Sequence, residues 1–164
     1  MRVLGIDPGY GRMGVAVLER MDDKKGGEIL LFSDCLETEA KQEFAERLGK
    51  LRRALLVLIK KWRPNMVALE KLFFTTNQKT AMQVAEVRGM IIALTQEKRL
   101  TLCEYTPLQI KIAVTGYGRA SKTQVANMLH KLIKIEGGHK SNNKISDDEY
   151  DAIAIALTCL ATIK

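Results

Sequence analysis

Several residue types are scarce in this chain of 164 residues, and each shortage excludes a class of protein. There are only two histidines and three widely spaced cysteines, namely Cys35, Cys103 and Cys159. Without a CxxC or a paired Cys/His spacing, neither a zinc site nor a disulfide framework is expected. No apolar run approaches the ~20 residues of a membrane span. The first strand pattern begins at residue 2 and leaves no room for a signal peptide. We therefore expect a cytoplasmic protein with reduced thiols.

The composition indicates a folded domain of ordinary size. Hydrophobic residues make up 46% of the chain and charged residues 27%, which is typical of globular rather than disordered proteins. A chain of this length can bury a full core. Since no linker and no internal repeat is recognisable, we expect a single domain over residues 1–164.

The positive charge is concentrated in one part of the chain. Residues 111–144 contain seven lysines or arginines and a single acid, Glu136, so six of the seven net positive charges fall there. The basic residues include Lys111, Arg119 and Lys122. Such a segment suits a polyanion such as a nucleic acid backbone. The alternative is a helix face that is rich in lysine only because it meets solvent.

The order of apolar patterns predicts an α/β fold, with a mixed five-stranded sheet and helices on both of its faces. Strands are expected at residues 2–7, 13–18, 28–35, 66–70 and 101–105. Helices are expected at residues 41–61, 78–98, 107–114 and 121–135, and a last one begins after Ser146. Ser146 and Glu149 form the S-x-x-E pattern of a capping box, which sets the start of that helix.

Four acidic residues stand where a catalytic metal site would need them. Asp7 and Glu70 each end an apolar strand, and Asp148 and Asp151 lie in the first turns of the last helix. Carboxylates spaced i, i+3 share one helix face, whereas Asp147 lies about 100° away from Asp148 as an alternative ligand. Each acid alone is also explained as a cap or strand-end residue. Together they would repel one another unless divalent cations were bound.

A glycine-rich turn after the first strand raises two alternatives. Residues 9–14 spell G-x-G-x-x-G, but the following residues are β-formers, whereas the dinucleotide-binding pattern requires a helix there. A Walker A motif is absent from the sequence. The strand, Asp7 and glycines also fit the phosphate hairpin of the actin and sugar-kinase superfamily. Those enzymes need two such domains, for which this chain is too short.

The predicted helix at residues 78–98 is apolar on almost every side. A helix on a sheet buries one face, so its surplus apolar surface predicts a second partner. We expect a homodimer through this helix, with Met82, Ala85 and Met90 at the interface. The alternative is that the helices near the C-terminus cover it.

Three segments together resemble the RuvC family of Holliday-junction resolvases, within the ribonuclease H-like superfamily. They are G-I-D-P-G at residues 5–9, A-L-E-K-L-F at 68–73 and D-E-Y-D-A-I-A-I-A at 148–156. The resemblance implies a ribonuclease H-like sheet and a Mg²⁺-dependent, homodimeric endodeoxyribonuclease. Such an enzyme nicks two strands of like polarity in a four-way DNA junction during recombination and repair. It also implies branch-migration motor proteins as partners.

The same resemblance assigns roles to individual residues. It places the catalytic metal ligands, around two Mg²⁺ ions that Mn²⁺ can replace, at Asp7, Glu70, Asp148 and Asp151. Phe73 corresponds to an aromatic residue that stacks at the junction centre, and Lys111 and Lys122 correspond to DNA-contacting lysines. Arg119 joins them as a DNA-binding candidate from the basic segment. Two other functions stay open, a ribonuclease H-like nuclease that acts on RNA and a junction-binding protein that does not cleave.

Overall fold

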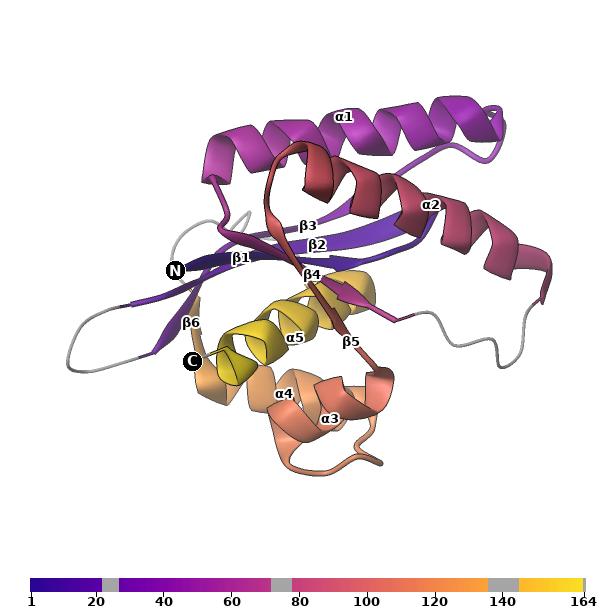
Figure 1. Ribbon diagram of the computed structural model, residues 1–164. Helices are drawn as coiled ribbons and strands as arrows, with labels where there is room; N and C mark the ends of the chain where they lie inside the picture. The colour runs from indigo at the N-terminus through magenta and orange to yellow at the C-terminus, as the bar shows by residue number, and fades with distance from the viewer. Residues whose placement is uncertain (22–26, 72–77, 136–144, 164) are drawn as a thin grey trace.

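A mixed β-sheet lies between two layers of helices in the computed structural model of the protein, which describes residues 1–21, 27–71, 78–135 and 145–163 (Figure 1). The sheet has six strands in the order β5-β4-β1-β2-β3-β6. Their bounds are β1 Arg2–Asp7, β2 Arg12–Arg20, β3 Glu28–Glu37, β4 Met66–Glu70, β5 Thr101–Tyr105 and β6 Ile133–Ile135. The first three strands form an antiparallel meander, while β4 is parallel to β1, β5 to β4 and β6 to β3.

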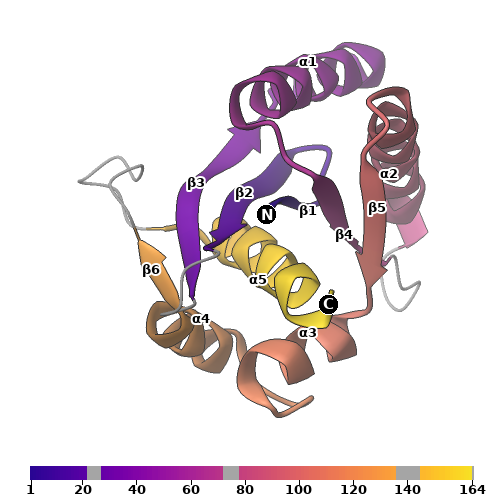
Figure 2. The same cartoon turned by 60° about the vertical axis from the view of Figure 1, so that its left-hand side comes forward.

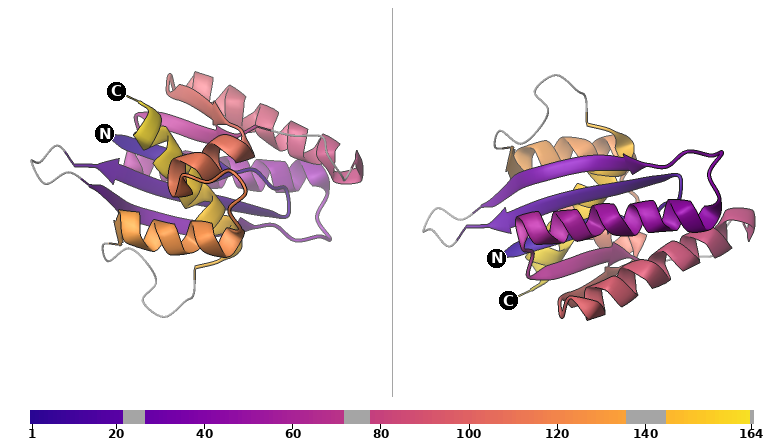
Figure 3. Two further views of the ribbon diagram at one scale, coloured as in Figure 1. Left: turned by 90° about the horizontal axis from the view of Figure 1, so that it is seen from below. Right: turned by 90° about the horizontal axis from the view of Figure 1, so that it is seen from above.

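Helices cover both faces of this sheet, as predicted (Figures 2 and 3). On one face lie α1, Phe44–Trp62, and α2, Gln78–Glu97. On the other face α5, Asp147–Thr162, crosses the sheet, with α3, Pro107–Thr115, and α4, Lys122–Leu132, packed around it. In the described ranges, no helix is both long enough and apolar enough to span a membrane.

The central helix α5 is buried between the sheet and the two shorter helices. All residues from Ala152 to Leu160 are buried, which explains why this segment is apolar on every side. The first turn of α5 lies directly on the β1–β2 hairpin. A Cβ atom added to Gly14 would lie 1.9 Å from the Asp148 carbonyl oxygen, and one added to Gly5 would lie 2.3 Å from the Ala152 carbonyl oxygen. Glycine is needed at both positions because the backbones approach so closely.

The predicted strand number was wrong by one. Residues 133–135 were expected to end a helix that began at residue 121, but α4 ends at Leu132, and Ile133–Ile135 forms β6 beside β3. The segment Ile-Lys-Ile alternates and is rich in a β-branched residue, so it favours a strand once an edge is available. Three residues at the end of a helical pattern carry too little periodicity to reveal this change.

Candidate active site

Two parallel neighbouring strands bring Asp7 and Glu70 to the same edge of the sheet. Asp7 is the last residue of β1 and Glu70 the last of β4, and the pair Ile6 and Leu69 is in register immediately before them. The apolar residues of each strand are buried, and the acids follow where each strand reaches the surface. The two adjacent strands therefore place their terminal carboxylates side by side at one edge of the sheet.

The first two turns of α5 bring Asp148 and Asp151 to this edge. The helix begins with the predicted capping box: the Ser146 side chain accepts a hydrogen bond from the Glu149 backbone N–H, and the Ser146 backbone N–H donates to the Glu149 carboxylate at 3.0 Å. Glu149 also accepts a hydrogen bond from the buried Ser33 hydroxyl at 2.7 Å, which ties the start of the helix to β3.

The carboxylates are close enough to perturb one another. Burial, followed by repulsion from Asp151, Glu70 and Asp148, raises the pKa of Asp7 from its ordinary value of 3.8 to about 7. Lys122 acts in the opposite direction. All four predicted acids thus contribute to a single electrostatic site, in which a fully ionised state is unfavourable without added positive charge.

Glu70 is perturbed in the same sense. Burial and then repulsion from Asp151 raise its pKa, while Lys122 and Arg88 oppose the rise. Arg88, on α2, donates hydrogen bonds to the Glu70 carbonyl oxygen and to the Glu104 carboxylate. This contact links α2 to the end of β4 that carries Glu70.

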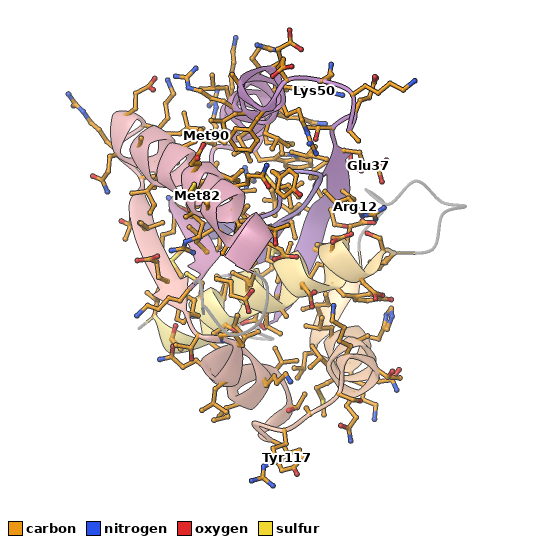
Figure 4. The ribbon with its side chains drawn as sticks, turned by 90° about the vertical axis from the view of Figure 1, so that its right-hand side faces the viewer. Arg12, Glu37, Lys50, Met82, Met90 and Tyr117 are labelled. Carbon is orange, nitrogen blue, oxygen red and sulfur yellow. The ribbon has the colours of Figure 1, made fainter. Side chains whose placement is uncertain are left out.

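Two cationic side chains hold the α5 carboxylates. Lys122 Nζ lies 3.0 Å from Asp151 Oδ2. On the other side, Arg12 Nε donates to Asp148 Oδ2 at 2.8 Å and the Arg12 guanidinium also pairs with Glu37 at 2.8 Å. Figure 4 shows Arg12 and Glu37 together beside the start of α5.

A thiol completes the surroundings of Asp148. Cys35 Sγ donates a weak hydrogen bond to Asp148 Oδ2 over 3.6 Å. Burial and the Asp148 charge raise the pKa of Cys35 to about 11, so the thiol keeps its proton at neutral pH. Cys35 is therefore a hydrogen-bond donor in this site and has little thiolate character.

A cavity of about 330 Å³ opens beside the carboxylates. Its charged lining consists of two acids, Glu70 and Asp151, and two lysines, Lys111 and Lys122, of which Lys122 pairs with Asp151. The remaining lining is apolar: Pro107, Ile110, Val125, Ala154 and Ile155. Helices α3 and α4 hold the lysines in place, and each begins with its own capping box, at Thr106 and Ser121. The arrangement suits an anionic strand whose phosphates meet lysines next to the carboxylates.

The sequence and the fold have close counterparts among known proteins. The family model of crossover junction endodeoxyribonuclease RuvC matches residues 3–159. This chain belongs to the RuvC family. The RuvC of Petrotoga mobilis is 43% identical over 157 residues, which cover 95% of this chain and 91% of that protein. The RuvC of Caldicellulosiruptor saccharolyticus is 40% identical, with 96% and 90% covered.

Solved structures agree with this membership. Thermus thermophilus RuvC superposes with a TM-score of 0.85 at 28% identity, over 98% of this chain and 94% of that chain. The same protein in complex with a Holliday junction substrate gives 0.83 at 26% identity, with the same coverage. A yeast mitochondrial Holliday junction resolvase shares the fold, with a TM-score of 0.73 at 18% identity over 97% and 77% of the chains. The RuvC resemblance and the ribonuclease H-like fold class are thereby confirmed.

A RuvC-family nuclease implies a divalent metal, and the residues of this site fit one in their chemistry. Carboxylate oxygens are the ligands that hard cations prefer, and a cation would relieve the repulsion that raises the Asp7 pKa. In their present orientations, however, no three His, Cys, Asp or Glu side chains of the described ranges are arranged to hold one ion. Asp148 is turned to Arg12 and Asp151 to Lys122. Arg12 and Lys122 would therefore compete with a bound cation for these two carboxylates.

The other predicted site residues lie in three different environments. Lys111 and Lys122 line the cavity, whereas Arg119 is exposed in the turn between α3 and α4, outside its lining. Phe73 lies outside the described residues. On α2, the Met82 side chain is 71% exposed and Ala85 is exposed, whereas Met90 is half-buried against the core (Figure 4).

Sequence reasoning missed three residues that bind the site acids: Arg12 and Cys35 contact the Asp148 carboxylate, and Arg88 contacts the main-chain carbonyl of Glu70. Arg12 was visible only as one residue of the glycine-rich turn, and Cys35 as one of three isolated thiols. Arg88 is a charged residue in a mainly apolar helix, and this pattern was the available indication that it has a specific partner. A charge inside such a helix requires a buried partner.

Proposed function

We propose that this protein is a structure-specific endodeoxyribonuclease that resolves four-way (Holliday) DNA junctions. It would make paired, Mg²⁺-dependent nicks in strands of like polarity during recombination and repair, with residues 1–164 acting as one nuclease domain. The observation that carries the proposal is the meeting of Asp7, Glu70, Asp148 and Asp151 beside a lysine-lined cavity, in a chain of the RuvC family. The junction complex of the Thermus thermophilus protein supports the choice of substrate.

The four carboxylates would hold the catalytic Mg²⁺, for which Mn²⁺ can substitute. Two bound ions would supply an activated water and charge stabilisation at the leaving oxygen, which gives 5′-phosphate and 3′-hydroxyl ends. The protein contributes the rest. Lys111 and Lys122 face the cavity and bind the phosphates of the strand to be cut. Lys122 leaves Asp151 in doing so, and its charge is then available to the scissile phosphate.

The preference for a four-way junction would come from a dimer of two copies of the chain. A four-way junction has near two-fold symmetry, and an isologous dimer presents two active sites with the same symmetry. The exposed residues of α2 that support this dimer recur every three or four positions: Met82, Ala85, Gly89 and Ala93. A Cβ atom added to Gly89 would meet nothing within 4 Å, so another helix can approach closely there. Met90 packs against the core and would lie at the margin of this interface.

The DNA arms would extend over the basic residues of α3 and α4. Lys111 and Lys122 bind next to the cut, and Arg119 is placed to contact a phosphate farther along the arm. Phe73, in the segment between β4 and α2, is proposed to stack at the junction centre. Branch-migration motor proteins are the partners expected from the family.

A cleavage assay on a synthetic mobile four-way junction tests the proposal. The wild-type protein should nick two strands of like polarity when Mg²⁺ is added and none in EDTA. Asp7→Asn should lose cleavage and keep or increase junction binding, because it removes a repulsive anion near the DNA. Asp147→Asn is the matched control, since Asp147 is exposed on the same helix turn and should be dispensable.

Two outcomes would contradict the proposed activity, and a third would contradict the role of Asp7. Preferred cleavage of structured RNA over the DNA junction would indicate a nuclease that acts on RNA. Junction binding without any nick, in either Mg²⁺ or Mn²⁺, would indicate a structural DNA-binding protein. Retained nicking by Asp7→Asn in Mg²⁺ would remove Asp7 from the metal site.

A further inference from the structure

Arg88 is an almost buried cation in the middle of α2, with a side chain that is 11% exposed. Its guanidinium donates one hydrogen bond to the main-chain carbonyl of Glu70 and another to the Glu104 carboxylate. Glu70 ends β4 and Glu104 lies near the end of β5. One side chain thus connects α2 with the ends of two neighbouring strands.

The carbonyl of Glu70 is the point at which β4 leaves the sheet. The last hydrogen bond between β4 and β5 runs from the Lys71 N–H to the Tyr105 carbonyl, at 2.8 Å. Arg88 binds the carbonyl just before that bond. A fixed carbonyl restrains the backbone at the Cα atom of Glu70, and hence the direction of the Cα–Cβ bond from which its side chain reaches the cavity it shares with Asp151.

Stability of the fold alone gives a weak reason for an arginine here. Removing a charged pair from water costs several kcal/mol per ion, and an apolar pair of similar size often stabilises a protein as well or better. The guanidinium offers what an apolar side chain lacks, a rigid fork that binds two acceptors at once. Here the Glu104 carboxylate is one acceptor and orients the guanidinium, and the main-chain carbonyl of Glu70 is the other acceptor.

We infer that Arg88, oriented by Glu104, is a positioning residue that holds the carboxylate of Glu70 in place for metal binding. The inference rests on the proposed function, in which Glu70 is a metal ligand. Arg88 touches neither the metal nor the DNA in this scheme and acts through Glu70. Because α2 is also the helix proposed to bind a second copy, the same contact ties the dimer helix to the active site.

The test compares three variants with wild type and with a matched control. Arg88→Met keeps an unbranched aliphatic stem and removes every donor. Arg88→Lys keeps the charge without the fork, and Glu104→Gln keeps an acceptor without the charge. The control is Arg52→Met, which also removes an arginine paired with a glutamate, because Arg52 lies 2.9 Å from Glu97 at the far end of α2.

Metal affinity is measured in the absence of DNA, by titrating each protein with Mn²⁺ and following the free ion by electron paramagnetic resonance. Arg88→Met should weaken Mn²⁺ binding by about tenfold or more, as is typical when a residue that orients a metal ligand is lost. Arg88→Lys and Glu104→Gln should show smaller losses, and Arg52→Met none. Junction nicking should need a correspondingly higher Mg²⁺ concentration in the same order.

Urea denaturation of the same proteins separates positioning from folding. If the Arg88 and Glu104 variants lower only the urea midpoint, with unchanged Mn²⁺ affinity and Mg²⁺ requirement, the inference is wrong. Should Arg88→Met fail to fold, Arg88→Lys and Glu104→Gln decide the question in the same way. A wild-type protein that binds Mn²⁺ but nicks no junction would refute the proposed function, while the Mn²⁺ titrations would still test Arg88.

Discussion

Asp7 should destabilise the metal-free protein at neutral and alkaline pH. Its pKa rises from 3.8 to about 7 in the folded state, through burial and the nearby carboxylates. Each pKa unit corresponds to 1.36 kcal/mol, so ionised Asp7 costs the fold roughly 4 kcal/mol. Below pH 3.8 the residue is protonated in both states and has no effect. As the pH rises toward 7 the cost grows, and above 7 it is complete.

Asp7→Asn removes this cost because the amide does not ionise. In EDTA at pH 8 the variant should be more stable than wild type by up to about 4 kcal/mol, and the difference should shrink toward zero near pH 4. Urea denaturation at several pH values measures it, with the midpoint and slope fitted together. Equal stability at pH 8, or a gain that is larger at pH 5 than at pH 8, would refute the electrostatic reasoning.

Added Mg²⁺ should reverse the order of stability. The free energy of unfolding of the wild type should increase by RT ln(1 + [Mg²⁺]/Kd), whereas that of Asp7→Asn should increase far less because the variant lacks a ligand. Asp147→Asn serves again as the control, since it removes an exposed carboxylate from the first turn of α5. This control should lose about 0.3–1 kcal/mol of stability, because a negative charge at a helix N-terminus is stabilising.

Three further experiments address the site, the helix contact and the dimer. At low Mg²⁺, single-turnover cleavage should increase with pH through about 7, because metal binding requires the ionised form of Asp7, and a flat profile from pH 5.5 to 8.5 would contradict this. Gly14→Ala should abolish cleavage and destabilise the fold by about 1–3 kcal/mol, because the new methyl group collides with the Asp148 carbonyl. Wild-type activity in a folded Gly14→Ala variant would be inconsistent with the observed contact. Met82→Glu should shift the protein toward monomer in sedimentation at micromolar concentration. Gly89→Ala should stabilise the monomer against urea by roughly 0.5–1 kcal/mol and still weaken self-association. A wild-type protein that sediments as a monomer would refute the dimer proposal.

The strands and helix starts that carry the acids could be predicted because their signals are local. Apolar runs that end in an acid identify β1 and β4, and the capping box identifies the start of α5. The order of the elements predicted a mixed sheet but not its pairing, since β4 could join either edge of the β1–β3 meander. The observed pairing of β4 with β1 is what brings Asp7 and Glu70 together.

The partners of the acids could not be predicted, because they depend on the packing of distant segments. Arg12 and Asp148 are 136 residues apart and meet only because Gly14 lets α5 lie on the hairpin. Arg88 meets Glu70 only when α2 packs over the end of β4. The sixth strand was missed for a related reason: the three residues of β6 form a strand because they pair with the free edge of β3, and their own sequence does not reveal this.

The position of α5 in the chain has a consequence for synthesis in the cell. This helix supplies Asp148 and Asp151 and packs against the backbones of β1 and β2, yet it follows every other described helix and strand in the sequence. A nascent chain that has already paired its strands still lacks two of the four proposed metal ligands and part of its core. Under the proposed function, the growing polypeptide can cut DNA only after α5 has been synthesised and has docked.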